Sequence, residues 1–312
     1  MKLKTIIVGV DGSPESVRAA TVGSTLATRA SAQCRLVHAA PDYWAAVATP
    51  ELGLDREELE RATLEHARTL LDAALKGHVP PALLAGLEYA VGRAPAVLAQ
   101  AAARQHADLL VLGGKHHRGL DRVSSSTIVH MVRAHDVPVL ATDGGAAEPR
   151  RILAAVDLSH AAPGVIAAAE AWAELFGAQL RVLSVVEPMP VVPGVSLRVS
   201  DSEVYHASEQ LLELEIWPQV RHRDAETVVR RGRAAAAIAD EAAQWQADVL
   251  VVGSHGKGWV DRLLIGSTSE RLLHVLPTTM LIIPVAKPAA DRPLDLATTG
   301  SARAVVPARG GA

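Results

Sequence analysis

Short runs of consecutive apolar residues alternate along this chain with longer stretches in which apolar residues recur every three or four positions. The first pattern is typical of strands buried on both faces, and the second of amphipathic helices. In the first half the expected strands are 4–10, 34–40, 87–91, 108–112 and 137–142, and the expected helices are 14–31, 55–76, 94–105 and 126–134. This alternation predicts a parallel sheet with helices on both faces.

The second half of the chain repeats the first. Gly113 corresponds to Gly253 at an offset of 140 residues, whereas Asp11 corresponds to Asp157 at an offset of 146. The change of offset places extra residues in the first copy, between its second and third strands. A repeat of this length is a whole domain. The sequence therefore predicts an α/β fold with two tandem, doubly wound, parallel five-stranded sheets.

The expected domains are residues 1–147 and 148–286, joined by a short Gly- and Ala-containing linker at 144–149. Residues 287–312 are rich in Ala, Pro, Gly and Arg without periodicity, and we expect this tail to be disordered.

Composition narrows the class of protein. The chain has 312 residues, is 49% hydrophobic and carries a net charge of −3, with no basic stripe and only 3% aromatic residues. These values favour two ordinary globular domains and argue against nucleic acid as a partner. No apolar run is long enough to span a bilayer. The single cysteine, Cys34, lies in an apolar strand and is expected to be a small buried residue, which favours a reducing, cytoplasmic location.

Three glycines follow the fourth strand of the second copy. Gly253 and Gly256 are separated by two residues, and nine more lead to Gly266, after which a helical pattern begins at Ser267. Glycines between a strand and a helix N-terminus let backbone N–H groups approach a phosphate closely. The alternative is structural, because tight turns in α/β sheets use glycine where φ must be positive.

Other candidates fall at the ends of neighbouring strands. Asp157 follows the first strand of the second copy, and Ser184 and Val185 end the second strand. Ligands of doubly wound sheets bind at this carboxyl edge, where an acid accepts hydrogen bonds from a ribose or a base. An equal alternative for Asp157 is an acid that complements a helix N-terminus.

With these motifs the chain resembles the universal stress protein family. The family signature Gly-x2-Gly-x9-Gly-(Ser/Thr) is matched by Gly253, Gly256, Gly266 and Ser267 without a gap. The end of the first strand, VDGS from Val10, and the fourth strand, ADLLVLG from Ala107, also match. The resemblance covers residues 3–143 and 150–286, as in the tandem two-domain form, and implies a Rossmann-like fold of the adenine nucleotide alpha hydrolase type.

The resemblance implies an adenine-nucleotide site for ATP, AMP or ADP, with or without Mg²⁺, and no metal held by the protein alone. Carried over by position, the adenosine would contact Ala155, Asp157 and Val185. The ribose and phosphates would contact Val252, Gly253, Gly256, Gly266, Ser267 and Thr268.

The first copy departs from this signature. Aligned by the repeat, Gly113 is kept, but His116 replaces the second glycine and Ser126 the third. A side chain at each place obstructs close backbone approach, so we interpret this site as degenerate. We interpret the cluster Lys115 to Arg118 as a solvated loop. The more specific alternatives are a cationic phosphate-binding site and a metal site.

Two classes of function remain. In the first, the protein is a stress-response regulator that binds a nucleotide and acts on an unknown protein partner. In the second, it is a slow ATPase or phosphate-transferring enzyme that uses the second site. Phosphoryl transfer needs a metal-holding acid, a cationic clamp and a positioned nucleophile. The loop offers Lys257 and Asp261, but the chain has no Walker lysine and no SGGxDS-like loop. The binding module is therefore favoured, with no catalytic residue assigned.

The last strand of each copy is an apolar edge candidate, at 137–142 and 279–285. Exposed apolar edges invite aggregation. Single domains of the family commonly pair through such strands. We expect the two strands to meet across a pseudo-two-fold axis, giving an intramolecular pseudo-dimer, with further homodimerisation left open.

Overall fold

The computed structural model describes residues 2–43, 55–114, 126–143, 147–188, 200–255 and 265–285. The loop with the Lys115 to Arg118 cluster, Gly256 and the tail beyond 285 lie outside the described residues. The first half contains β1 (Thr5–Gly9), α1 (Pro14–Ala30), β2 (Gln33–Ala40), α3 (Arg56–Leu75), α4 (Pro81–Ala85), β3 (Glu88–Val91), α5 (Ala94–Arg104), β4 (Leu109–Gly113), α6 (Ser126–Ala134) and β5 (Val139–Thr142).

The second half follows the same order. It contains β6 (Arg151–Val156), α7 (Ala162–Phe176), β7 (Gln179–Val186), α8 (Asp201–Leu211), the π-turn η2 (Leu212–Ile216), the 3₁₀ turn η3 (Trp217–Gln219), β8 (Glu226–Arg231), α9 (Ala234–Gln244), β9 (Val249–Gly253), α10 (Ser267–Val275) and β10 (Thr279–Ile283). In the part that the structure describes, no helix has both the length and the apolarity to cross a bilayer.

Local sequence explains where the elements begin and end. Ser13 precedes α1, and its hydroxyl accepts the N–H of Ser16 at 3.2 Å, while Pro14 occupies the first turn, where its missing N–H costs nothing. The helix ends at Ser31 in the left-handed conformation, with φ 53°. Its counterpart α7 ends at Gly177 with φ 64°, so both copies stop the helix in the same way.

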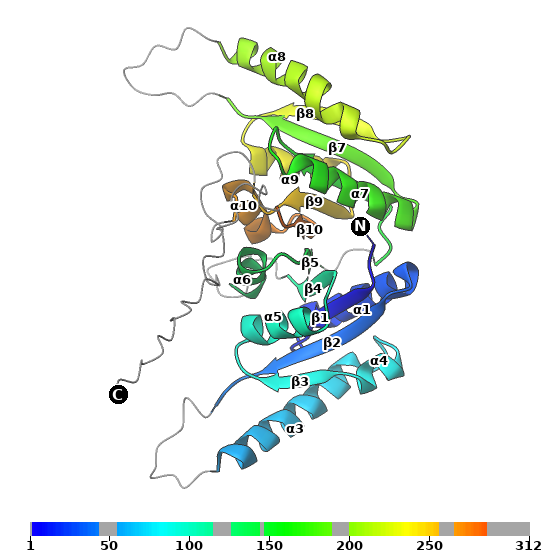
Figure 1. Ribbon diagram of the computed structural model, residues 1–312, viewed down its shortest axis with the longest axis vertical. Helices are drawn as coiled ribbons and strands as arrows, with labels where there is room; N and C mark the ends of the chain where they lie inside the picture. Colours follow the sequence, from blue (N-terminus) through cyan, green and yellow to red (C-terminus); the bar gives the residue numbers. More distant parts are fainter. Residues whose placement is uncertain are drawn as a thin grey trace, which may run out of the picture.

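The strands form one ten-stranded sheet in the order β3-β2-β1-β4-β5-β10-β9-β6-β7-β8 (Figure 1). Within each half all pairs are parallel, as expected. The strand order reverses between β1 and β4, and again between β6 and β9. A crevice opens at such a reversal, at the carboxyl ends of the strands, so each half has one natural place for a ligand.

The two halves join through their last strands, which confirms the predicted meeting of the two edges. β5 and β10 pair antiparallel, with Leu140 opposite Leu281, and both leucines are fully buried. The five-stranded sheets therefore continue into one another instead of ending in two exposed edges. Apolar layers on both faces of the sheet also contain residues of both halves.

The duplication extends to single hydrogen bonds. Asp108 Oδ2 accepts the N–H of Thr5 at 2.9 Å, and Asp248 Oδ2 accepts the N–H of Arg151 at 3.0 Å. In both copies the carboxylate before the fourth strand thus ties down the start of the first strand.

Candidate functional site

A cavity of about 400 Å³ lies at the carboxyl ends of β6, β7 and β9. The first turn of α10 closes one side, and residues of α7, α8 and α9 complete the wall. Eight of the nine residues predicted from the sequence line it: Ala155, Asp157, Val185, Val252, Gly253, Gly266, Ser267 and Thr268. The ninth, Gly256, lies outside the described residues. The structure thus brings together residues that span more than one hundred positions of the chain.

Asp157 fits both of the roles considered for it. It lines the cavity directly after β6. Its Oδ1 also accepts the N–H of Ser159 at 3.1 Å and so shapes the turn into α7. Asp11 makes the same bond to Ser13 at 2.9 Å in the first copy. The turn alone therefore accounts for an aspartate at both places.

Gly253 lies in a closely packed place. Its φ lies outside the left-handed region, but an added Cβ would be 3.0 Å from the Cβ of Ala161 and 3.1 Å from the carbonyl oxygen of His255. A Cβ on Gly113 would lie only 2.6 Å from the carbonyl carbon of Glu15. The persistence of Gly113 in the first copy thus follows from the packing of β4 against α1.

Gly266 stands at the N-cap of α10, with φ −56° and ψ 138°. Since this φ is negative, the absence of a side chain, not freedom of the backbone, is what glycine contributes. Its own N–H donates to the carbonyl of Ser254 at 2.8 Å. A glycine N-cap provides no side-chain bond to the first turn. No side-chain cap therefore competes for the N–H groups of that turn, which lines the cavity. Together with the helix dipole, these groups favour an anion.

Sequence reasoning missed two serines that hold this arrangement. Ser269, buried in the first turn of α10, donates its hydroxyl to the carbonyl of Gly253 at 2.7 Å. Ser254 Oγ accepts the N–H of Val285 at 3.2 Å, and its own N–H donates to the carbonyl of Ile283 at 2.8 Å. The serine-rich helix start was the available signal for Ser269, but its partner is apparent only in three dimensions.

The charge of the cavity wall is acidic among the described residues. Asp157 and Glu187 line it, and no lysine or arginine does within the described ranges. Glu187 Oε1 accepts the N–H of Ala234 at 2.8 Å and thereby caps α9, whose N-cap residue Arg233 makes no side-chain capping bond. Among the described residues, no three or more His, Cys, Asp or Glu side chains are grouped so that they could hold a metal ion.

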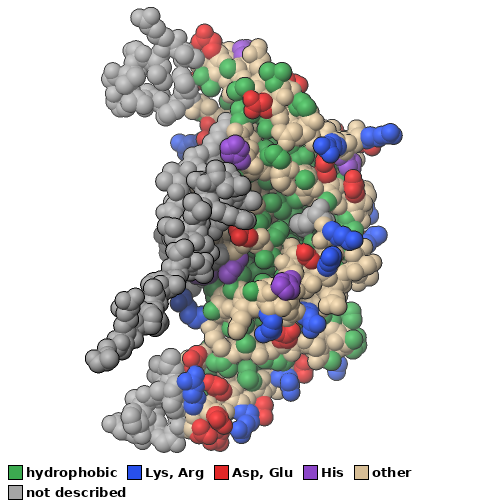
Figure 2. Space-filling view, in the orientation of Figure 1, with side chains coloured by type: hydrophobic (Ala, Val, Ile, Leu, Met, Phe, Trp, Pro, Cys, Tyr) green, Lys and Arg blue, Asp and Glu red, His purple; other side chains and the backbone are tan. Residues whose placement is uncertain are grey.

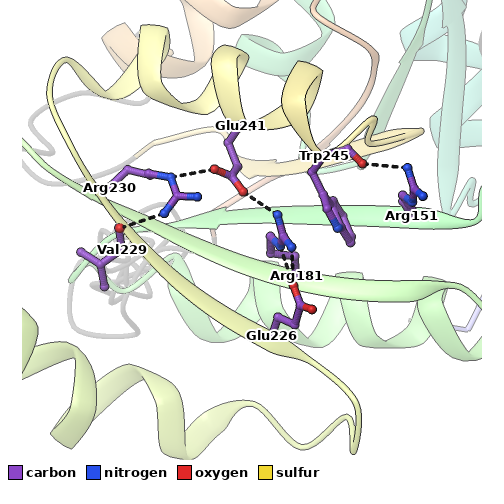
Figure 3. Close-up of polar contacts among 7 residues, drawn as sticks. All are labelled: Arg151, Arg181, Glu226, Val229, Arg230, Glu241 and Trp245. Atoms are coloured by element: carbon purple, nitrogen blue, oxygen red, sulfur yellow. Dashed lines mark hydrogen bonds and ion pairs between the residues drawn. The ribbon is translucent and has the colours of Figure 1, made fainter.

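A second polar cluster, also missed from the sequence, holds α9 against the sheet (Figure 3). Glu241 is 2% exposed and accepts from Arg181 at 2.7 Å and from Arg230 at 2.8 Å. Arg181 also bonds Glu226 at 2.8 Å and stacks on the ring of Trp245 at 4.5 Å. Because Ile238 and Ala234 of α9 line the cavity, this cluster fixes one wall of the site from behind.

The first copy keeps a smaller cavity of about 330 Å³ at the corresponding place. Asp11, Ala39, Leu112, Gly113 and Thr127 line it, at the positions that correspond to five lining residues of the second copy.

One alignment made from the sequence is wrong. α6 and α10 each have nine residues and start at Ser126 and Ser267. Ser126 therefore corresponds to Ser267, and Ser125 corresponds to Gly266. The loop before α6 is one residue shorter, 114–125 against 254–266, which the constant offset of 140 did not allow for. The third glycine is still replaced by serine, while the Ser-Thr start of the helix is shared by both copies.

The fold and the site define a class: a tandem pair of doubly wound α/β domains, with a ligand crevice at the carboxyl edge of each half-sheet. The model of the universal stress protein family matches residues 2–143 and 148–284. The chain belongs to the universal stress protein family, in its tandem two-domain form.

Individual relatives agree with this assignment. A universal stress protein of Mycobacterium tuberculosis is 27% identical over 291 residues, which are 89% of this chain and 96% of the relative. One from Thermus aquaticus is 31% identical over 141 residues, 43% of this chain and 98% of the relative. The crystal structure of a universal stress protein from Archaeoglobus fulgidus shares the fold, with a TM-score of 0.57 and 15% identity over 90% of this chain and 96% of that one.

Proposed function

We propose that this universal stress protein is a stress-response regulator that binds an adenine nucleotide, ATP or its mono- and diphosphate, in the second domain. The observation that carries the proposal is that eight of the nine predicted site residues line one cavity of about 400 Å³, among them the signature residues Gly253, Gly266 and Ser267. That volume is in the usual range for small-molecule sites, about 300–1,000 Å³. The apolar strand ends suit an adenine ring, and the uncapped start of α10 suits a phosphate.

The phosphates determine how the ligand is oriented. The carboxylates of Asp157 and Glu187 repel them, while the N-terminus of α10 attracts them. The phosphates therefore lie against Gly266, Ser267 and Thr268, and the adenosine lies towards β6 and β7. Asp157 then accepts a hydrogen bond from the ribose or base. Mg²⁺ would be held chiefly by phosphate oxygens and water, as is usual for this ion.

We propose one tight site per chain. The first-domain cavity is smaller, and Ile128 occupies the position that corresponds to Ser269, so the bond that ties the helix start to the strand end has no counterpart there. Serine and histidine also replace two signature glycines in its loop. Binding to the first domain should be at least tenfold weaker, a gap of about 1.4 kcal/mol.

Slow ATP hydrolysis is the alternative function. It needs a cationic clamp on the phosphates. The described wall of the cavity has no lysine or arginine, Lys257 lies outside the described residues, and the chain has no Walker lysine. We therefore propose that the protein senses a nucleotide and that a partner protein responds to the bound state.

Titration calorimetry of the full chain with ATP, ADP and AMP tests the proposal, together with an assay of phosphate release. We expect about one nucleotide bound per chain, and ATP hydrolysis that is much slower than nucleotide binding. Two equivalent sites would contradict the assignment to the second domain. Rapid multiple-turnover hydrolysis would show that the protein is an ATPase and would contradict the proposal.

A further inference from the structure

Helix α8 with the π-turn η2 lies between two hollows. On one side, Val204, Ser208 and Leu212 line the proposed nucleotide cavity. They are four residues apart and therefore share one face of the helix. On the opposite side, Glu209 and Glu213 line an open groove of about 640 Å³. A single helix thus contributes to both the cavity and the outer surface.

Part of the groove lining is apolar. Leu214, Trp217 and Val229 line the groove, so it lies between η2, η3 and strand β8. Leu214 is 74% exposed, the largest exposure among the large hydrophobic side chains of the described chain. It sits in the middle of the π-turn, a helix defect that is frequent at functional sites. Without a partner, this leucine leaves apolar surface in water.

The rim of the groove is acidic. Two of the five carboxylates in residues 200–219, Glu209 and Glu213, line it, and the range contains no lysine or arginine. His206 also lines the groove and lies 3.5 Å from Glu209. The neighbouring arginines of β8 already have partners: Arg230 bonds Glu241 at 2.8 Å, and Arg231 stacks on Tyr205 of α8 itself at 3.3 Å from the ring centroid. Figure 2 shows hydrophobic and acidic side chains at the upper end of the molecule, where α8 lies in Figure 1.

From this arrangement we infer that the groove between α8–η2 and β8, defined by Glu209, Glu213, Leu214, Trp217 and Val229, docks a basic amphipathic helix of a partner protein. Apolar residues of the partner pack on Leu214 and Trp217, and its lysines or arginines meet Glu209 and Glu213. Apolar anchors give such helix-in-groove contacts their affinity, and the charges give orientation and specificity.

The first domain provides an internal comparison. Its helix α3 has no part in the described wall of the first cavity. It carries arginines as well as glutamates, and one of its leucines, Leu70, is 55% exposed. α3 is therefore a control surface on the same chain, where the same changes of charge and hydrophobicity can be introduced.

The docking inference is independent of the nucleotide, but its regulation rests on the proposed function. A nucleotide that contacts Val204 and Ser208 restrains α8 and so changes the free energy of binding in the groove. By linkage, the docked helix changes nucleotide affinity by the same factor.

The test measures fluorescence anisotropy of a labelled peptide that places leucines on one helical face and lysines on the other. A peptide of the same composition in scrambled order is the control. We expect the full chain to prefer the amphipathic peptide. E209K/E213K and L214S should each weaken binding about tenfold, while E58K/E65K and L70S on α3 should leave it within about twofold.

Equal losses from the α3 and α8 variants, or no preference over the scrambled peptide, would overturn the inference. If sedimentation shows a homodimer that L214S dissociates, the occupant is a second copy, which also overturns it. Calorimetry separates the two proposals. Failure to bind nucleotide with the peptide still bound refutes the proposed function alone, and nucleotide binding without peptide binding refutes the groove alone.

Discussion

The guanidinium of Arg133 donates to Glu270 Oε1 at 2.7 Å and joins helix α6 of the first domain to helix α10 of the second. Glu270 lies one residue after Ser269, in the same first turn that closes the proposed nucleotide cavity. The cavity and the domain interface therefore share a helix, and any movement of α10 on binding reaches the other domain directly.

The ion pair between Arg133 and Glu270 should contribute little to the free energy of unfolding, but this contribution should change when nucleotide binds. Both side chains are about one-third exposed, so a double-mutant cycle with R133A and E270A should give about 0.5 kcal/mol. The charge swap R133E/E270R should restore most of what either single reversal loses. Thermal unfolding with and without nucleotide measures this. A cycle energy that is identical in both conditions would show that the interface does not respond to the ligand.

Gly266→Val should abolish nucleotide binding without unfolding the chain. The backbone at Gly266 has φ −56°, which valine adopts, so the added side chain obstructs the cavity and does not strain the turn. Calorimetry with ATP provides the measurement. Ser125→Val, at the corresponding place before α6, is the matched control and should leave the affinity unchanged. Wild-type affinity in Gly266→Val would refute the site.

Ser269→Ala should lower both stability and affinity. The mutation removes the 2.7 Å bond to the Gly253 carbonyl and leaves a buried acceptor unpaired, which costs about 1–3 kcal/mol. Thr278→Val is the control, because Thr278 makes a similar 2.9 Å bond to the Asp248 carbonyl and does not line the cavity. It should lower the unfolding free energy by a similar amount without changing the nucleotide affinity.

Glu241→Ala should be the most destabilising of these changes. It leaves Arg181 and Arg230 without the buried carboxylate that both contact, and breaking a buried ion pair costs about 3–5 kcal/mol. Glu226→Ala removes another partner of Arg181, but this side chain is 60% exposed, so the loss should stay below about 1 kcal/mol. Denaturant unfolding distinguishes them. Similar losses from both variants would contradict the role of burial.

Cys34 should be inert at neutral pH. Cys34 is partly buried, not fully buried as the sequence predicted. This burial disfavours the thiolate and raises the pKa of the thiol from 9.0 to about 12. Labelling with a maleimide should be slow in the native protein at pH 7.5 and fast after denaturation. Above pH 9 the unfolded chain loses this proton while the native chain keeps it, so Cys34 lowers stability as pH rises from 9 towards 12. The variant Cys34→Ala should lose less stability over that range, and rapid native labelling would contradict the prediction.

The sequence by itself determined the duplication, most of the elements and most of the candidate site, although it missed the short helix α4. The apolar periods predicted α6 with the bounds that the structure has and the start of α10 at Ser267, because helix and strand periodicity is a local property of the chain. The glycine spacing and the ends of the first two strands placed Asp157, Val185 and Gly266 at one edge. Parallel strands bring their carboxyl ends to the same side of a sheet, so no tertiary information was needed for that step.

Only the tertiary structure decided how these pieces hold one another. The one-residue shift that aligns Ser126 with Ser267 lies in a loop, where no periodicity fixes the register. The bond from Ser269 to Gly253 and the burial of Glu241 between two arginines depend on distances between segments that are far apart in sequence. The two faces of α8 likewise became distinct only when β7 and β8 were in place beneath it. Long-range packing sets these contacts, and a linear pattern of residue types carries no record of it.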